Sequence, residues 1–127
     1  IVAMSFCEPR SWDRTLSSLR PLGLPTSKLL FEPIVQAAKA HHTLLEINNS
    51  SLKPCRNKVE ARPNNLEILR LCKQYEVPVI LGSDAHISFD IATYDHALEL
   101  VKETEFPESL ILNTDVARFK QYLHLDK

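Results

Sequence analysis

From residue 31 onward, hydrophobic residues recur in two alternating patterns, a helical spacing and short apolar runs. The helical spacing predicts helices over about residues 32–42, 63–75, 90–103 and 115–124. The short apolar runs predict strands over about residues 44–48, 77–81 and 110–112. Strands that alternate with helices form a parallel sheet covered by helices, so the pattern predicts an α/β fold. In such folds, ligands gather at the carboxyl ends of the strands.

Each predicted helix carries one apolar face that should pack against the sheet. The residues of the first three faces, taken helix by helix, are Ile34, Ala37, Ala38 and His41; Leu66, Ile68, Leu69, Leu71, Cys72 and Tyr75; and Ile91, Tyr94, Leu98 and Val101. Pro33 falls in the first turn of the first helix and Pro63 at the start of the second, where proline is tolerated. Asn113–Thr114 or Asp115 is placed to cap the last helix. The apolar strand 77–81 should be covered on both faces.

Residues 1–30 follow neither period, and they contain the prolines Pro9, Pro21 and Pro25. This composition favours an irregular arm. A chain of 127 residues has room for one domain, so we assign residues 1–30 to the arm and 31–127 to the α/β layer. Three parallel strands leave an open sheet edge. The layer should therefore be part of a larger barrel or be covered by a partner.

The composition excludes several classes of protein. Lys plus Arg (15) nearly balances Asp plus Glu (16), which argues against a nucleic-acid-binding face. No stretch approaches the roughly 20 apolar residues of a membrane span, and the first residues do not resemble a secretory signal. The three cysteines contain no C-x-x-C pair, so we expect free thiols and a cytoplasmic location. Only two glycines, Gly23 and Gly82, are present.

The strongest candidate chemistry follows the strand at 77–81, in the run Gly82-Ser83-Asp84-Ala85-His86. In an extended backbone, residues i and i+2 point the same way, so Asp84 and His86 can converge. A carboxylate oxygen and an imidazole nitrogen are suitable ligands for Zn, Mn or Fe. The alternative is structural: Asp84 caps a turn and His86 bonds to a nearby group.

A second polar run, Asn48-Asn49-Ser50-Ser51, follows the strand at 44–48. Its amide and hydroxyl groups could hold a phosphate or orient metal ligands. A plain turn is the alternative. Because this run and the run after residue 81 both follow strands, the two could border one cleft.

The remaining histidines are weaker candidates for a functional site. His41 and His42 are neighbours on a helix end and diverge by about 100°, so they cannot bind one ion together, and we expect one in the core and one in water. His96 and His124 lie in helical patterns and are expected to be structural or exposed. The chain contains no G-x-S-x-G sequence that would indicate a serine hydrolase.

Several runs taken together resemble the carboxyl-terminal part of PHP-domain (polymerase and histidinol phosphatase) proteins, above all the YcdX-type phosphatases of bacteria. These runs are Ala37-Ala38-Lys39-Ala40-His41-His42, Leu45-Glu46-Ile47-Asn48-Asn49-Ser50-Ser51, Leu69-Arg70-Leu71-Cys72-Lys73, Leu81-Gly82-Ser83-Asp84-Ala85-His86-Ile87-Ser88-Phe89-Asp90-Ile91 and Leu110-Ile111-Leu112-Asn113-Thr114. The resemblance covers about residues 31–124.

The resemblance implies part of a distorted (β/α)7, TIM-like barrel with a trinuclear cluster of zinc or manganese that hydrolyses phosphate esters. Asp84 and His86 match the family's last two metal ligands, and Asn48, Asn49 and Ser50 would lie at the rim of the cleft. Clustered divalent ions activate a water and neutralise charge on the phosphoryl oxygens. The substrate would be a small phosphorylated molecule.

The chain also departs from the family pattern. Family members begin with an H-x-H strand and carry further Glu and His ligands, whereas this chain has no H-x-H, and residues 1–30 do not resemble the family. A catalytic zinc generally needs three protein ligands, so the isolated chain is expected to be inactive unless self-association or a complementing chain supplies the others. The alternative is a non-catalytic α/β subunit that binds a partner through its open barrel edge.

Overall fold

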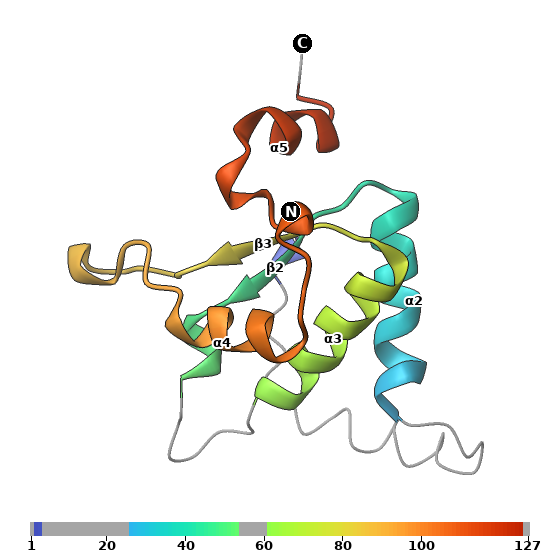
Figure 1. Cartoon of the computed structure of the whole chain (residues 1–127), viewed down its shortest axis with the longest axis horizontal. Helices are drawn as coiled ribbons and strands as arrows, with labels where there is room; N and C mark the ends of the chain where they lie inside the picture. The colour runs from blue at the N-terminus through green and yellow to red at the C-terminus, as the bar shows by residue number, and fades with distance from the viewer. Residues whose placement is uncertain (1, 4–25, 54–60, 126–127) are drawn as a thin grey trace.

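The computed structural model describes residues 2–3, 26–53 and 61–125. Its strands are β1 (Val2–Ala3), β2 (Leu45–Asn48) and β3 (Val79–Gly82), and its α-helices are α2 (Thr26–Ala40), α3 (Arg62–Tyr75), α4 (Asp95–Glu103) and α5 (Val116–Tyr122) (Figure 1). The predicted α/β class is confirmed. The arm expected at 1–30 includes β1 and the start of α2, so the prediction of an irregular segment is wrong there. Residue 1 and residues 4–25 of it lie outside the described part of the chain.

The three strands form one parallel sheet in the order β1-β2-β3. On one face, the register pairs Leu45 with Val79 and Ile47 with Leu81, and all four side chains are buried. The opposite face is only half-buried and carries Glu46, Asn48, Ile80 and Gly82. The strand predicted at 77–81, which is β3, was expected to be covered on both faces. This expectation is wrong, because polar residues of the neighbouring strand β2 lie on the second face of the sheet.

Helices α2 and α3 lie side by side and pack on the buried face of the sheet (Figure 1). The core that they share with β2, β3 and α4 is built of aliphatic and aromatic side chains, among them Phe31, Val35, Ala38, Ile47, Leu66, Leu69, Cys72, Val79, Leu81 and Leu100. The face predicted for α3 is confirmed, since all its members are buried except Tyr75, which is half-buried. Within the described residues, no helix is long and apolar enough to cross a membrane.

Helix α2 begins earlier than the apolar spacing predicts, at Thr26 rather than near residue 32. Pro33 therefore lies in the helix interior and not in the first turn. Its side chain is exposed, and a proline at this position removes one backbone hydrogen bond of the helix. The buried face also differs from the predicted one: Val35 is fully buried, whereas Ala37 is exposed.

Helix α4 begins at Asp95, five residues later than about residue 90. A 3-10 turn, η3 (Ser88–Asp90), and the left-handed backbone of Ala92, with φ of 59°, interrupt the helical pattern before it. Consequently the helix buries Ala97 and Leu100. The predicted face is wrong at Ile91 and Leu98, which are exposed, whereas Tyr94 and Val101 are half-buried and pack against the core. Ile91 and Leu98 are 68% and 42% exposed.

The strand predicted at 110–112 is replaced by two 3-10 turns, η4 (Glu108–Leu110) and η5 (Leu112–Thr114). Ile111, between them, makes a single parallel bridge to Val79. Two residues further along, the carboxamide of Asn113 binds the backbone of Leu81 on both sides: Leu81 N donates to Oδ1 at 2.7 Å, and Nδ2 donates to Leu81 O at 2.8 Å. The Asn113 side chain thus makes the two hydrogen bonds to Leu81 that the backbone of a neighbouring strand would have made.

The predicted cap of the last helix is confirmed, because the backbone amide of Arg118 donates to Asp115 Oδ1 at 2.9 Å. All four described α-helices also end alike. Each is followed by a non-glycine residue in the left-handed region, with φ between 49° and 55°, namely His42, Glu76, Glu105 and His124. The next residue donates to the carbonyl five positions back, which defines the Schellman motif. Glycine usually holds this position, so the scarcity of glycine extends to the helix ends.

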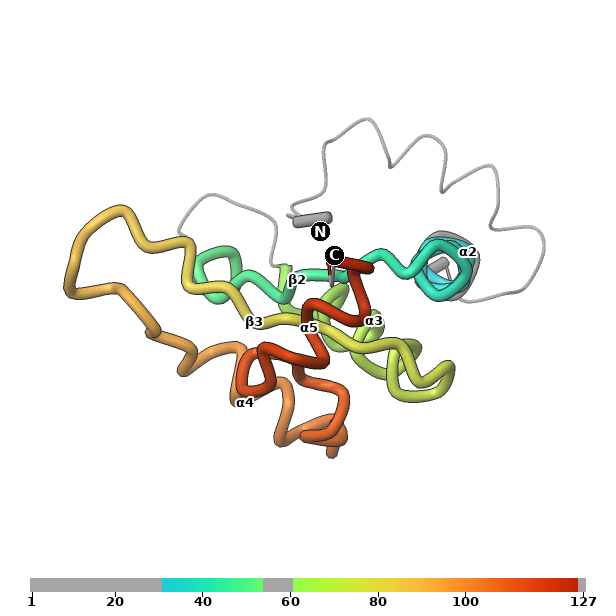
Figure 2. The backbone as a smooth tube through the Cα atoms, turned by 90° about the horizontal axis from the view of Figure 1, so that it is seen from above, coloured from blue at the N-terminus to red at the C-terminus, as the bar shows by residue number. Residues whose placement is uncertain are grey.

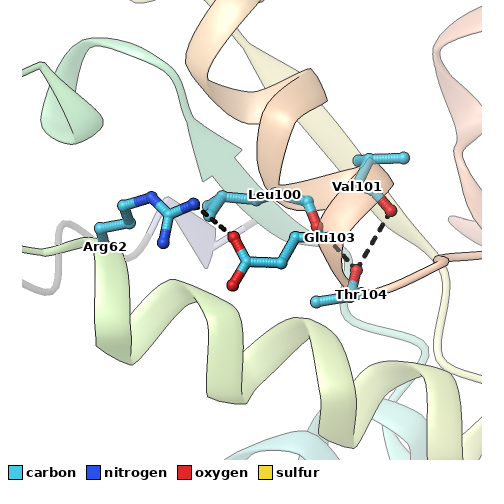
Figure 3. A network of polar contacts seen from close by, with 5 residues as sticks. All are labelled: Arg62, Leu100, Val101, Glu103 and Thr104. Carbon is cyan, nitrogen blue, oxygen red and sulfur yellow. Dashed lines mark hydrogen bonds and ion pairs between the residues drawn. The ribbon is translucent and has the colours of Figure 1, made fainter.

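Polar contacts connect α3 to the end of α4 (Figure 3). Arg62, at the start of α3, forms an ion pair with Glu103. Thr104 closes the last turn of α4, with Oγ1 donating to Leu100 O at 2.8 Å, and its own carbonyl accepts from Lys73 Nζ at 3.0 Å. Both charged contacts are at least partly exposed, so we expect them to contribute little beside the core.

We predict that Glu76→Gly stabilises the protein by about 1 kcal/mol, because glycine adopts the left-handed conformation without the clash of a Cβ atom. Urea unfolding monitored by circular dichroism measures the change. Glu99→Gly is the matched control, since Glu99 is exposed in the interior of α4 and glycine there should destabilise by about 1 kcal/mol. Equal destabilisation by both substitutions would contradict the assignment.

Candidate functional site at the carboxyl ends of β2 and β3

The two polar runs start from paired positions at one edge of the sheet. Asn48, the last residue of β2, lies opposite Gly82, the last residue of β3. Immediately beyond, the backbone amide of Asn49 donates to Gly82 O at 2.7 Å. The fold therefore brings the two runs to the same edge, which is where parallel α/β sheets place ligands. The segment that follows β3 extends away from the described helices and strands in both views (Figures 1 and 2).

Asp84 and His86 lie in this segment, and both are exposed. The strand ends at Gly82, and Asp84 has a left-handed backbone with φ of 51°, so the extended geometry expected to align the two side chains is wrong. They are instead linked through the backbone: His86 Nδ1 lies 2.8 Å from the carbonyl oxygen of Asp84. An imidazole that donates from Nδ1 leaves the lone pair of Nε2 free to bind a metal.

Asp84 and His86 offer an oxygen and a nitrogen donor, and this chemistry suits zinc or manganese. The number of donors falls short of a complete site. Among the residues that the structure describes, no three His, Cys, Asp or Glu side chains are grouped closely enough to hold an ion. These residues therefore fit a share of a metal site whose other ligands would come from elsewhere.

Glu46 is a third acidic group at this edge, and the sequence pattern did not single it out. A Cβ atom added to Gly82 would lie 1.9 Å from Glu46 Oε1, so the carboxyl group packs directly over the glycine. Glu46 is half-buried, and its carboxylate makes no hydrogen bond or ion pair with the described residues. The available signal was a carboxylate between two apolar residues of the predicted strand, Leu45 and Ile47.

Asn48 and Asn49 are used within the fold. Asn49 is 1% exposed, and its Oδ1 accepts from the backbone amide of Ala97 at 2.9 Å, which satisfies a free donor in the first turn of α4. Asn48 Oδ1 accepts from Ser51 N at 3.1 Å in a local turn that leads into the 3-10 turn η2 (Ser50–Leu52). The turn expected as the structural alternative is present. A role of Asn48, Asn49 or Ser50 toward a ligand stays a prediction.

The remaining titratable groups lie elsewhere. His41 and His42 are both exposed, so the expectation that one enters the core is wrong: helix α2 ends before them, at Ala40. His124 is exposed, as predicted, and His96 is half-buried. Cys72 is a free, fully buried thiol whose pKa burial raises to about 12, so it stays protonated and inert. Cys7 and Cys55 lie outside the described residues.

Comparison with known proteins finds similarity to curated bacterial proteins that are named as probable phosphatases. It is 41% identical over 103 residues to a protein of Caldicellulosiruptor saccharolyticus named as a probable phosphatase, which covers 81% of this chain and 42% of that relative. A probable phosphatase of Clostridium novyi is 41% identical over 101 residues, covering 80% of this chain and 41% of the relative. One of Acetivibrio thermocellus is 35% identical over 105 residues, covering 83% and 42%.

The chain thus spans about two fifths of the length of the curated relatives it matches. No protein-family model matches it. The similarity covers most of this chain, and these relatives share the name probable phosphatase.

We predict that Gly82→Ala destabilises the protein by about 1–3 kcal/mol, because the new methyl group would overlap the carboxyl group of Glu46. Adding Glu46→Ala removes the overlapping atoms and should recover most of the loss. Urea unfolding of the two single variants and the double variant forms a cycle that isolates the coupling between the positions. Additive effects would show that Glu46 does not pack over Gly82.

Proposed function

We propose that this chain is the carboxyl-terminal section of a metal-dependent phosphatase of the PHP type. In this proposal, β2 and β3 are two strands of a distorted (β/α)7 barrel, and Asp84 and His86 are two ligands of its zinc or manganese ions. The similarity to probable phosphatases along most of the chain supports the reaction class. The proposed substrate is a small phosphorylated molecule, and the proposed location is the cytoplasm.

One observation carries the assignment of the ligands: the 2.8 Å contact between His86 Nδ1 and the carbonyl oxygen of Asp84. Metal-bound histidines almost always donate their second ring N–H to a carboxylate, a carbonyl or water, which fixes the ring and its tautomer. The left-handed backbone of Asp84 supports the same assignment, because its carbonyl lies where His86 can reach it. This conformation is uncommon outside glycine and tends to occur at functional sites.

Each group at the sheet edge has a separate task in the proposed site. Bound divalent ions would activate a water and neutralise the phosphoryl oxygens. Asp84 and His86 would hold those ions from the segment after β3. Asn48 and Ser50 would line the rim, while Asn49 fixes the start of α4 beneath it. Gly82 leaves room for Glu46 at the same edge, and the half-buried face of the sheet would line the barrel interior.

The isolated chain is expected to be inactive, because two protein ligands are fewer than a catalytic zinc generally requires. The relatives are more than twice as long as the region they share with this chain. In the proposal, segments equivalent to the rest of the relatives supply the missing ligands, through a larger chain, a complementing chain or self-association.

A second candidate function is a non-catalytic subunit that binds a partner. The large hydrophobic side chains of Ile87, Phe89 and Ile91, which are 59%, 91% and 68% exposed, favour a covered surface on the segment after β3. Sedimentation velocity of the wild type and of a Phe89→Ser variant discriminates between the functions. A wild-type oligomer that the variant abolishes, without metal binding by Asp84 and His86, would favour the subunit.

The direct test of the phosphatase proposal is a chimera. The section of the Caldicellulosiruptor saccharolyticus relative that matches this chain is replaced by residues 31–125, and hydrolysis of p-nitrophenyl phosphate is measured with Zn²⁺ or Mn²⁺. We expect metal-dependent hydrolysis. Asp84→Asn and His86→Asn in the chimera should each lower kcat at least about 100-fold, since each removes an ion ligand.

Asn is the suitable replacement at residue 84 because it tolerates the left-handed backbone. Asp95→Asn is the matched control for charge, since Asp95 is exposed in the first turn of α4. His41→Asn is the control for histidine. Full activity of the Asp84→Asn and His86→Asn chimeras would contradict the assignment of both ligands.

A further inference from the structure

A pair of histidines meets at the other end of the sheet. His42 lies in the turn between α2 and the amino end of β2, and His124 lies two residues after the end of α5. Their ring centroids are 5.0 Å apart, with the ring planes at 78°. The ring of Tyr122 completes the cluster, at 5.5 Å from that of His42. In Figure 1, α5 lies near the turn that leads from α2 into β2, whereas the segment after β3 extends to the opposite side.

The backbone holds both rings in place. His42 and His124 are the left-handed residues of two Schellman motifs, with φ of 51° and 54°. In the first motif, Thr43 N donates to Ala38 O at 2.9 Å, and in the second, Leu125 N donates to Lys120 O at 2.8 Å. A side chain at such a position starts from a backbone fixed by two hydrogen bonds. The approach of the two rings therefore follows from two defined helix ends and not from flexible loops.

We propose that His42 and His124 form a second metal site, in which the two imidazoles bind one Zn²⁺ ion and fasten α5 to the turn before β2. Imidazole nitrogen is a preferred ligand of Zn²⁺. The ion would take its other ligands from water, because no third His, Cys, Asp or Glu of the described residues joins the pair. The site is independent of the phosphatase proposal.

The spacing of the rings agrees with a shared ion. An imidazole nitrogen binds Zn²⁺ at about 2.0–2.1 Å, which places the ring centroid about 3.2 Å from the ion. Two such rings at a tetrahedral angle would have centroids about 5.2 Å apart. The observed centroid separation is 5.0 Å, which is close to this value.

Both histidines are exposed, so an ion could reach them without opening the core. Neither ring makes a hydrogen bond with a described residue, and their nitrogens therefore need not break one to bind. Tyr122 fills the space beside His42, and burial raises the pKa of its hydroxyl. The tyrosine therefore contributes packing and not a negatively charged ligand. A bound ion would join segments that are 82 residues apart in the sequence, as counted between His42 and His124.

The test uses isothermal titration with Zn²⁺ on the full chain carrying Asp84→Asn and His86→Asn, so that the proposed catalytic ligands cannot contribute. We expect this protein to bind Zn²⁺ and His42→Asn or His124→Asn to weaken that binding at least tenfold. Asparagine keeps the left-handed backbone at both positions. His41→Asn is the matched control, because His41 is an exposed neighbour outside the pair, and its binding should equal that of the parent.

Hydrogen exchange gives the second readout. Zn²⁺ should slow amide exchange in residues 116–125 of the parent and leave exchange in the His42→Asn variant unchanged. His42→Gly, which also suits the left-handed backbone, serves if circular dichroism shows that the asparagine variant is unfolded. Unchanged Zn²⁺ affinity in a folded His42 variant, or an equal loss in His41→Asn, would overturn the proposal.

Discussion

The arrangement at the carboxyl edge of the sheet depends on two asparagine carboxamides. Strands β2 and β3 contain only four residues each, so they offer few backbone hydrogen bonds. Asn113 binds both polar groups of Leu81, and Asn49 connects the end of β2 to the first turn of α4. Neither bond could be replaced by an apolar side chain without leaving backbone groups unpaired. The carboxamides thus fix where α4 and the last 3-10 turns lie relative to the strands.

This framework explains why the candidate ligands emerge where they do. Once β3 ends at Gly82, the chain turns away with the left-handed Asp84, and His86 binds back to the carbonyl of that residue. Gly82 itself is required by the carboxyl group of Glu46. Asp84 and His86 are thus held by the backbone that leads out of the sheet, and their side chains are exposed. This combination suits residues that must keep a fixed position and still bind an ion.

Sequence reasoning recovered the elements in which apolar spacing decides the structure. The buried rows of α3, which include Leu69 and Cys72, and the strands β2 and β3 follow directly from that spacing. It failed where single residues override it: Pro33 lies inside a helix, Ala92 interrupts a helical pattern, and the Asn113 side chain substitutes for a strand. Each of these depends on contacts between segments or on one backbone angle, which periodicity does not contain.

The candidate site likewise has one feature that the sequence could predict and others that it could not. Proximity of the two polar runs could be predicted, because parallel strands end at one edge. The burial of Asn49 against α4 and the packing of Glu46 over Gly82 could not, since both join residues that are more than 30 positions apart in the sequence. The contact between His86 and the Asp84 carbonyl depends on a left-handed residue that the sequence did not indicate.

The central claim is that His86 is oriented in advance as a metal ligand through its contact with the Asp84 carbonyl. The most direct measurement is the tautomer of His86, by long-range ¹H–¹⁵N correlation spectroscopy of the ¹⁵N-histidine-labelled chain at a pH where the ring is neutral, with His86→Asn to assign its signal. We predict a proton on Nδ1 and a free lone pair on Nε2. A neutral ring protonated on Nε2 would contradict it, because Nδ1 could not then donate to the carbonyl.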